Sequence, residues 1–349
     1  MDGLELRAVR GEDEPYLGAF AQAFAPGDVV RSAIERWGHF ATPHPSGLRV
    51  VVAKAVADAR GPERLAAIVM ARPVPARIDE DGRVFAEVIA AAVHPLDRIG
   101  VRGPRVLAAL GAAYLAEHSA PERDVITFGF GGESAWRSLR FGPGVELIRR
   151  QPLLVFDVNQ GTAALPSGVF SLHAFGDNAA ALFERCAIDW RACAVRDATT
   201  LAWRFPADGG YVRLVVGDAE GTLDAALVTA RGAPGTLRVL DWLVPSDAVG
   251  AQSLLVQALI TTARTSGLAR IELALPPWSP AFNTLQNHGF KVHASDRIVF
   301  ARSAHPRLDT WWLRDHWWFQ PFDQARPRSP TEPPEGPLGS CPVTADPCP

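Results

Sequence analysis

The feature that most constrains the fold is one order of strands and helices that occurs twice in the 349-residue chain. Each half starts with a strand, continues through helical sequence, three strands, a long helix and a further strand, and ends with a short helix and a final strand. A repeat of this kind predicts two copies of one α/β unit rather than a single large domain. The predicted fold class is α/β in the broad sense, α+β with a mixed central sheet and flanking helices.

The repeat also sets the predicted boundaries. A first domain is expected at residues 1–160 and a second at 168–304, joined near "VNQGTAALPSG". Residues 305–324 contain "DTWWLRDHWWFQPF", and because so many aromatic rings are costly to expose, we predict a Trp-rich clasp over an interdomain surface. A wall of rings that stacks on a ligand is the alternative. The Pro-, Gly-, Ser- and Glu-rich tail at 325–349 is predicted to be disordered.

The periodicity places the individual elements. In the first half, strands are predicted at 4–9, 48–56, 64–74, 83–93, 124–130 and 145–158, and helices at 14–24, 29–40, after Gly103 and at 133–141. In the second half, strands are predicted at 168–175, 211–218, 223–231, 237–245, 269–276 and 297–304, and helices at 178–188, 251–267 and 279–290.

Charge and hydropathy exclude several classes of partner. The net charge of -3 and the pI near 6.3 give no overall attraction to nucleic acid or to an anionic membrane. No apolar run approaches the roughly 18 residues that span a bilayer, and the start "MDGLELRAVRGEDE" lacks the basic-then-apolar order expected of a signal peptide. We therefore predict a cytoplasmic protein, with no nucleic acid and no membrane as partner.

Residue usage adds two smaller predictions. Arginine far outnumbers lysine, and together with abundant Ala, Gly and Pro this is typical of GC-rich bacterial genomes. The four cysteines form no CxxC pair and predict no metal site; Cys186 and Cys193 are expected to be buried thiols, while Cys341 and Cys348 in the tail stay unassigned.

The stretch "FAEVIAAAVHPLDRIGVRGPRVLAAL", residues 85–110, contains the main candidate site. A strand runs into His94-Pro95, then a turn with two arginines and two glycines leads into an Ala- and Leu-rich helix. A helix N-terminus has unpaired N–H groups and a positive dipole end, so a turn of this kind predicts an anion site. The alternative is an ordinary strand-to-helix turn whose glycines serve backbone conformation only.

The ends of both halves carry a family resemblance. A strand ending in V-x-P, a glycine-bearing loop, a long helix, a strand and a short helix that closes on Phe141-Gly142 resemble an acyltransferase of the GNAT (Gcn5-related N-acetyltransferase) superfamily. The second half resembles the same family through "SPAFNTLQNHGF". Together the resemblances cover residues 4 to about 304 and imply two tandem GNAT-like domains, as in some bacterial proteins, with acetyl-CoA or another acyl-CoA as cosubstrate and no metal.

The resemblance assigns the loop to the pyrophosphate of acyl-CoA. The family pattern is Gln/Arg-x-x-Gly-x-Gly/Ala; Arg98 and Gly103 match its first and last positions, Val101 stands at the middle glycine, and Gly100 lies one place earlier. Backbone N–H groups would bind the phosphates, with Arg98 and Arg102 adding charged contacts. The predicted cosubstrate-binding residues are Val93, Arg98, Ile99, Gly100, Val101, Arg102, Gly103, Pro104 and Arg105.

Glu87 is the predicted catalytic residue. In "FAEVIAAAVHP" it lies eight positions before Pro95, where Gcn5-like members of the family have a glutamate as general base. A carboxylate in a partly buried strand can accept the proton that an amine must lose. The alternative is a solvated or arginine-paired strand glutamate.

The family's general acid is a tyrosine after the fifth strand, and none is found there. The three tyrosines are Tyr16, Tyr114 and Tyr211, all outside "ESAWRSLRF" and "SPAFNTLQNHGF". His94 is a candidate proton donor, although a histidine at a strand end is more often a structural residue.

The second half lacks the phosphate loop. After "RVLDWLVP" it has Ser246 and Asp247, which suit an N-cap and would oppose a pyrophosphate, so this half is predicted to be a degenerate copy that shapes the substrate groove. Asp241, Trp203 and Arg204 are its predicted substrate-binding residues. The last two lie in "VRDATTLAWRF", which also contains Arg196 and resembles a segment of tandem acyltransferases; packing of a helix is the alternative role.

Three functional classes follow. The first is an acyl-CoA-dependent N-acyltransferase that transfers the acyl group directly to a small amine, with Glu87 as base. The second is a noncatalytic GNAT-like binding or scaffold protein, suggested by Val101 and the missing tyrosine. The third is a peptidoglycan-type aminoacyl transferase, which would be expected to have a helical-hairpin insertion and a basic surface for tRNA; the sequence indicates neither.

Overall fold

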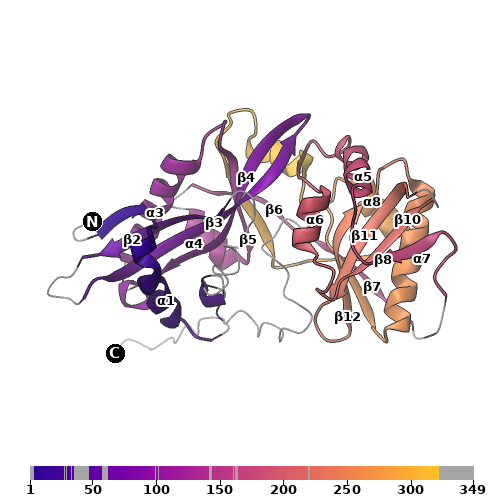
Figure 1. The fold of residues 1–349 in the computed structure, drawn as a ribbon, viewed down its shortest axis with the longest axis horizontal. Helices are drawn as coiled ribbons and strands as arrows, with labels where there is room; N and C mark the ends of the chain where they lie inside the picture. The colour runs from indigo at the N-terminus through magenta and orange to yellow at the C-terminus, as the bar shows by residue number, and fades with distance from the viewer. Residues whose placement is uncertain are drawn as a thin grey trace, which may run out of the picture.

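The computed structural model describes residues 4–26, 28, 30–32, 34, 47–56, 62–98, 100, 102–140, 144–159, 161, 164–218 and 221–321. The chain forms two mixed β-sheets with flanking helices, which lie beside one another along the long axis (Figure 1). No helix in these ranges is both long and apolar enough to cross a membrane. The predicted tail at 325–349 and most of the helix predicted at 29–40 lie outside the described residues.

The N-terminal sheet has nine strands, seven of them in one continuous order. That order is β1 (Leu4–Ala8), β2 (Arg49–Ala55), β3 (Arg64–Ile78), β4 (Asp81–Val93), β5 (Asp124–Gly131), β15 (Ile298–Ser303) and β6 (Glu146–Arg150). Its helices are η1 (Gly11–Asp13), α1 (Glu14–Gln22), η2 (Pro95–Asp97), α3 (Arg102–His118) and α4 (Glu133–Arg140). β4 and β5 are parallel, whereas the other neighbours in this order are antiparallel.

The C-terminal sheet has seven strands. Their order is β14 (Lys291–His293), β7 (Leu153–Asp157), β13 (Arg270–Leu273), β12 (Thr236–Leu243), β11 (Leu223–Arg231), β10 (Val212–Gly217) and β8 (Val169–Leu172). Its helices are α5 (Asn178–Ala187), α6 (Ala198–Arg204), α7 (Val249–Thr265) and α8 (Pro280–Asn287). Here β12 and β13 form the parallel pair. The predicted class, a mixed sheet with flanking helices in two tandem units, is confirmed.

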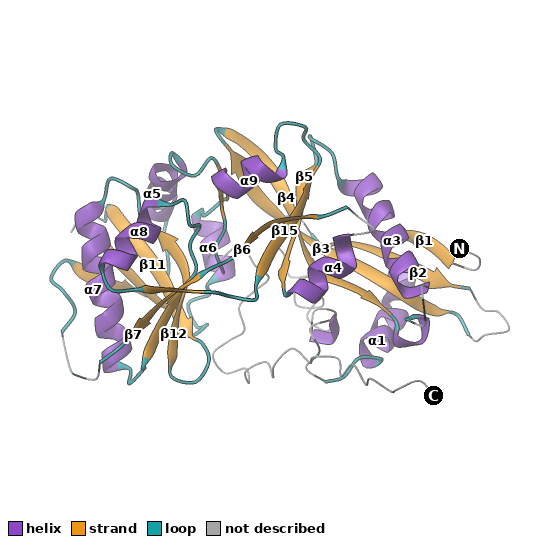
Figure 2. Cartoon of the chain, turned by 180° about the vertical axis from the view of Figure 1, so that it is seen from behind, coloured by secondary structure: helices purple, strands orange, loops and turns teal. Residues whose placement is uncertain are grey.

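The two sheets exchange one strand each. β7 follows β6 in the sequence but pairs with β13 and β14 of the C-terminal sheet, whereas β15, near the end of the chain, pairs with β5 and β6 of the N-terminal sheet (Figure 2). The prediction of one strand over 145–158 is therefore wrong. The chain leaves the first sheet at Gln151-Pro152, where proline has no N–H for a ladder. Neither sheet is complete without residues from the other half.

A second connection joins the halves at the far end of β3. The short strand β9 (Ala192–Ala194) pairs with the end of β3, and β16 (Trp317–Trp318), which follows helix α9 (Thr310–His316), pairs with β9. These two strands complete the nine-stranded sheet. Segments from the second half thus lie directly beside β3.

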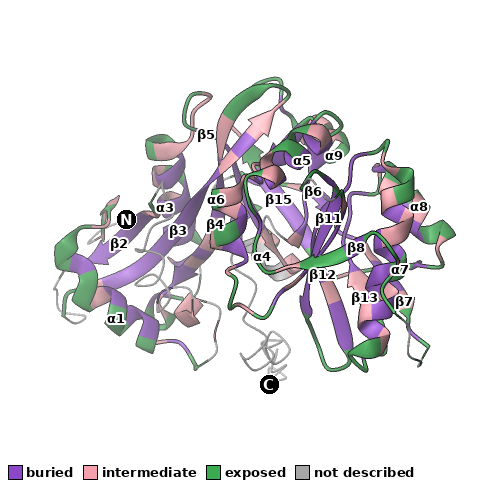
Figure 3. Ribbon diagram, turned by 45° about the vertical axis from the view of Figure 1, so that its right-hand side comes forward, coloured by how far each residue is buried: buried purple, intermediate pink, exposed green. Residues whose placement is uncertain are grey.

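Alternation along β3 explains why helices cover both faces of the first sheet. Ala67 and Val69 belong to a core with Leu110 of α3, whereas Ile68 and Met70 belong to a core with helix α1. Successive side chains of a strand point to opposite faces, so a continuous apolar strand needs cover on both sides. Figure 3 shows β3 buried along most of its length.

Candidate active site

The candidate site begins where two parallel strands separate. β4 and β5 pair from Val84↔Asp124 to Glu87↔Phe128, after which β4 runs on to Val93 and β5 to Gly131 without further pairing between them. A bulge at Ile89 of β4, opposite the step from Met70 to Ala71 of β3, follows two residues after Glu87. A bulge bends its strand, and here it lies at the start of the divergence. Unpaired backbone groups on the facing edges of β4 and β5 are hydrogen-bonding positions for a ligand.

The loop after β4 depends on its glycines. Gly100 has a φ of 57°, which is unfavourable for other residues. At Gly103, the second residue of α3, a Cβ would lie 3.1 Å from the Arg98 Cα. The chain therefore folds back tightly on the first turn of the helix. A larger residue at Gly103 must push the loop away from the helix N-terminus.

The loop arginines have partners within the protein. Arg98 donates from Nε to the Val93 carbonyl at 2.9 Å, and its guanidinium lies 5.0 Å from the centroid of the Phe24 ring. Arg102 Nη2 lies 3.4 Å from Oδ1 of the buried Asp97, which also pairs with Arg64. That Arg98 and Arg102 contact phosphates stays a prediction; in the structure both side chains also make contacts within the loop.

The backbone at the start of α3 provides the remaining donors. The first four N–H groups of a helix have no partner within it, and Pro104 has none to offer, so Arg102, Gly103 and Arg105 supply the available N–H groups. Pro104 and Arg105 are exposed, and Val93 is buried at the end of β4. Ile99 and Val101, two further predicted contacts, lie outside the described residues. The loop thus combines a helix N-terminus with a close glycine turn.

Glu87 forms a buried ion pair. Its partner is Arg72, directly opposite on β3, which donates to Glu87 Oε2 from Nε at 3.1 Å and from Nη2 at 2.7 Å. Both side chains are 4% exposed. Of the two roles that the sequence left open for Glu87, the described geometry is that of the arginine-paired strand residue. The carboxylate nevertheless lies on the last β4 residue that pairs with β5.

Trp203 joins this pair from the second half. Its ring lies 5.1 Å, centroid to Cζ, from the Arg72 guanidinium, within the range of a cation–π contact. Two predicted residues, Glu87 and Trp203, therefore meet through Arg72. The sequence patterns did not select Arg72, although a signal was present: Arg72 and Glu87 are each seven positions from the nearer residue of the two-residue turn Asp79-Glu80, which places them opposite one another.

The other predicted substrate residues lie in the core. Asp241 is fully buried and accepts from Arg196 Nε at 3.0 and 3.2 Å, while Arg196 also donates to the Ala194 carbonyl. Arg204 is buried and donates to the Pro321 carbonyl at 3.0 Å. A substrate would reach Asp241 or Arg204 only if this core opened. Their contacts here hold the two ends of the α6 segment in place.

None of the histidine and tyrosine residues considered as a general acid, namely His94, Tyr16, Tyr114 and Tyr211, has surroundings that favour this role. Burial and the neighbouring Arg64 lower the pKa of His94, so its ring is neutral at pH 7 and a weak candidate acid. Burial raises the pKa of Tyr114, whose hydroxyl lies 3.4 Å from Asp124 Oδ2. Tyr16 donates to Glu63 at 3.0 Å, and Tyr211 is buried. These geometries single out no general acid.

The second sheet repeats the divergence in the same register. β12 and β13 pair from Thr236↔Arg270 to Arg238↔Glu272, and a bulge at Leu240 follows two residues later. Arg238 therefore occupies the position of Glu87, and Leu240 that of Ile89. The long helix that follows has 17 residues in both halves, with glycine second in each, Gly103 in α3 and Gly250 in α7. Asp241 is thus not the counterpart of Glu87.

Solved structures match this arrangement along most of the chain, whereas no family profile and no curated protein matches it. A probable N-acyltransferase of unknown function from Enterococcus faecalis V583 is 13% identical with a TM-score of 0.58, over 88% of this chain and 74% of that chain. A GCN5-related N-acetyltransferase from Anabaena variabilis is 11% identical with a TM-score of 0.57, over 86% and 73%. A tandem GNAT protein from the clavulanic acid biosynthesis pathway is 14% identical with a TM-score of 0.51, over 87% and 99%. The chain has the tandem GNAT fold.

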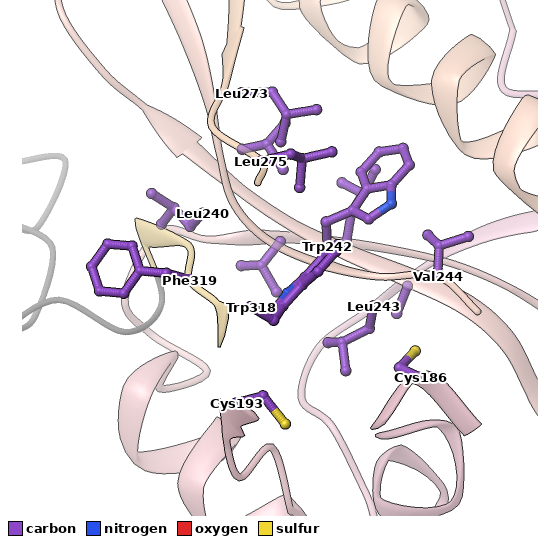
Figure 4. Packing of buried hydrophobic residues seen from close by; sticks show 14 of the residues in the cluster. Cys186, Cys193, Leu240, Trp242, Leu243, Val244, Leu273, Leu275, Trp318 and Phe319 are labelled. Carbon is purple, nitrogen blue, oxygen red and sulfur yellow. The ribbon is translucent and has the colours of Figure 1, made fainter. Parts of the chain in front are cut away.

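In the C-terminal copy of this tandem GNAT fold, the protein's own chain fills the divergence. Gln320 accepts from the Trp242 N–H of β12 at 3.0 Å, and Gln151 donates to the Leu275 carbonyl beyond β13 at 2.8 Å. Trp318 and Phe319 are buried beside β12 (Figure 4). A cavity of only about 30 Å³ lies between the strands, bordered in part by Gln151 and Pro321.

The residues that fill the C-terminal copy form a defined group, which we call the plug: Gln151 and the segment 317–321. The sequence predicted a clasp at 305–324 over an interdomain surface. In the structure this segment contacts both sheets: Trp317 packs on Phe85 and Phe128 of the first, while Gln320 accepts from β12 of the second. Trp318 stacks on Trp190 with ring centroids 4.2 Å apart and an interplanar angle of 8°. The two thiols of this core, Cys186 and Cys193, are buried, as predicted. The two copies therefore share a register but differ in what occupies the opening.

Proposed function

We propose that the chain is an acyl-CoA-dependent N-acyltransferase that holds acetyl-CoA, or another acyl-CoA, in its N-terminal copy. The observation that carries the proposal is the contrast between the two divergences: β12 and β13 are closed by the plug, whereas β4 and β5 separate next to a glycine turn and the N-terminus of α3. Among the described residues, the backbone of β4 beyond Glu87 accepts a side-chain hydrogen bond from Arg98, which donates to the Val93 carbonyl. The fold neighbours with N-acetyltransferase names support the same class of chemistry.

The acyl-CoA molecule has chemical groups that fit this opening. Its pantetheine arm contains two amides, which can pair with the separated backbone edges of β4 and β5, much as the amides of Gln151 and Gln320 pair with the backbone in the other copy. Its pyrophosphate suits the N–H groups of Arg102, Gly103 and Arg105 at the positive end of α3. Gly103 keeps this approach free of a side chain.

Glu87 is the proposed general base. The amine nitrogen attacks the thioester carbonyl, the C–N bond forms, the C–S bond breaks, and the nitrogen loses a proton to the Glu87 carboxylate while the leaving thiolate takes one from solvent. Glu87 suits this role because it is the last residue of β4 that pairs with β5, at the point where the two strands begin to separate. Its pairing with Arg72 offsets part of the cost of burying the charge. The acceptor is a small amine.

Calorimetry on the full chain tests the cosubstrate site. Neither half has a complete sheet alone, so the intact protein is titrated with acetyl-CoA, and one molecule should bind per chain. Gly103→Ala should weaken binding about tenfold, because its Cβ pushes the loop from the helix N-terminus. Gly250→Ala is the matched control, since a Cβ there meets nothing within 4 Å. Equal affinity in both variants, or two molecules per chain, would refute the assignment.

A noncatalytic acyl-CoA-binding protein is the second candidate, favoured by the engagement of Glu87 with Arg72. Thiol release from acetyl-CoA in the presence of amino sugars, polyamines and amino acids separates the two. Turnover that falls about 100-fold or more in Glu87→Gln, with acetyl-CoA affinity retained, supports the enzyme. Binding of acetyl-CoA without thiol release for any of these amines supports the binding protein.

A further inference from the structure

Arg72 is held from two sides by residues of different halves. On one side its fork donates twice to Glu87 Oε2, and on the other its guanidinium lies 5.1 Å from the centroid of Trp203. The first contact comes from the neighbouring strand and the second from α6 of the C-terminal copy. An ion pair at the vertex of one copy is therefore covered by an aromatic ring from the other.

The position of Trp203 is fixed by its own helix. Asp197 caps α6 by accepting from the Thr200 N–H at 2.7 Å, and the preceding Arg196 is tied to Asp241. At the other end, Arg204 donates to the Pro321 carbonyl. The helix cannot shift without breaking one of these contacts, all of which lie in the C-terminal half or the plug.

β9 sets the distance between α6 and Arg72. Its residue Ala194 pairs with Ala76, four residues beyond Arg72 on β3, and the Val195 N–H donates to the Pro75 carbonyl at 2.9 Å. The chain then passes through Arg196 into α6. A backbone ladder thus joins the strand that carries Arg72 to the helix that carries Trp203.

We propose that Trp203 and Arg72 are positioning residues for Glu87, so that the C-terminal copy completes the site of the N-terminal copy. The inference rests on the proposed function, in which Glu87 is the base. Arg72 has a long flexible side chain, and a flat ring against its planar guanidinium restricts the orientations in which the fork meets the carboxylate. Trp203 thereby fixes where the Glu87 carboxylate lies and how strongly its charge is stabilised. This gives the degenerate copy a role besides closing its own opening.

Carboxyl-carbon NMR on the full chain tests the inference without any substrate. Glutamate labelled with ¹³C at the carboxyl gives a signal for Glu87, assigned by its loss in Glu87→Gln, whose shift is followed against pH. In Trp203→Ala the Glu87 titration should move to higher pH, because a loosened Arg72 stabilises the carboxylate less. Trp203→Phe, which keeps a ring, should restore much of the wild-type titration.

Trp312→Ala is the matched control. It removes a ring that lies 5.3 Å from the Arg191 guanidinium, a contact of the same type away from Glu87, and should leave the Glu87 titration unchanged. Trp203→Leu retains apolar bulk and gives the same comparison if the alanine variant does not fold. A Glu87 titration that is identical in wild type, Trp203→Ala and Trp203→Leu would overturn the proposal.

The outcome is separable from that of the proposed function. Acetyl-CoA affinity, measured by calorimetry, should stay near the wild-type value in Trp203→Ala, because the ring lies at the ion pair and not at the loop. Once an acceptor is identified, turnover should fall about tenfold and recover in Trp203→Phe. Failure of acetyl-CoA to bind the wild type refutes the proposed function, whereas an unmoved titration refutes the positioning role.

Discussion

The molecule has two places where a parallel pair of strands separates, β4 from β5 and β12 from β13. The strand pairing is the same in both, but the residues at and between the strands differ. In both, a parallel pair ends two residues before a bulge, at Glu87↔Phe128 in the first sheet and at Arg238↔Glu272 in the second. The first has a carboxylate at its vertex and leads to a glycine turn. The second has an arginine there, 3.7 Å from Glu272, and is filled by the plug. The two sheets thus keep the same strand register, while the equivalent position carries a negative charge in one and a positive charge in the other.

This difference concerns how the backbone groups of separated strands find hydrogen-bond partners. Separated strands leave backbone N–H and C=O groups that must find partners, since an unsatisfied buried group is costly. In the second copy the side-chain amides of Gln151 and Gln320 supply two such partners from within the chain. Variants of the plug, of the buried Arg196–Asp241 pair and of His94 should therefore differ in their effects on stability and on acetyl-CoA binding.

Removing the main ring of the plug should have the largest effect. Trp318→Ala should lower the free energy of unfolding by about 3–5 kcal/mol, because a fully packed indole that stacks on Trp190 leaves a cavity. Denaturant unfolding measures this loss. Trp311→Ala, at a site 68% exposed, is the control and should change stability by less than about 0.5 kcal/mol. Similar small losses in both would mean that the plug is not a packed part of the second copy.

Breaking the buried Arg196–Asp241 pair of the second copy should lower stability without changing acetyl-CoA binding. Asp241→Asn should cost about 3 kcal/mol of unfolding free energy, because it leaves the Arg196 charge buried without its carboxylate, and should leave acetyl-CoA affinity unchanged. The double variant Arg196→Met, Asp241→Leu should recover much of that loss. If Asp241→Asn abolishes turnover while stability is unaffected, Asp241 has a substrate role after all.

The glutamine of the plug should contribute less than its tryptophan. Gln320→Ala should lower the free energy of unfolding by about 1–2 kcal/mol, since the Trp242 N–H loses its acceptor within the core. Amide hydrogen exchange at Trp242 should speed up at the same time. Gln286→Ala, on an exposed helix face, serves as the control. Unchanged exchange at Trp242 would show that another group accepts from this N–H.

The weakest of these effects is a difference in pH dependence. Because burial holds the pKa of His94 below its ordinary value, the unfolded chain takes up a proton first as the pH falls, and stability is lost from about pH 6.5 downward. His94→Gln should remove this contribution to the loss of stability with falling pH, whereas His173→Gln, at an exposed site, should not. The equivalent position in the second copy is Pro245, which cannot titrate. An unaltered slope in His94→Gln would contradict this.

Local patterns sufficed to predict most of the fold. Alternating and continuous apolar runs located β3, β4, β11 and β12, and the Ala- and Leu-rich segments located the two 17-residue helices. The strand exchange was not predicted, because β7 and β15 have equally apolar sequences and nothing local states which sheet accepts them. Pro152 was the signal that the strand predicted over 145–158 had to break.

The candidate site was predicted only in part. Glu87 and the glycine turn were identified from adjacent residues in the sequence, whereas the Trp203 contact joins residues more than a hundred positions apart. Asp241 was predicted to bind substrate, yet it lies three positions beyond Arg238, the counterpart of Glu87, and one beyond the bulge at Leu240. Strand register and bulges are set by pairing, which single residues do not reveal.

The strand exchange also sets a schedule for the nascent chain. β6 ends at Arg150 and β15 begins at Ile298, so 147 residues must be synthesised before the strand that lies between β5 and β6 leaves the ribosome. At roughly 5–20 residues per second this takes about 7–30 s. Throughout that interval β5 has an open edge, and open edges pair with other chains. The first sheet therefore cannot be completed until the second copy has been translated, and for that time β5 and β6 both lack the strand that lies between them.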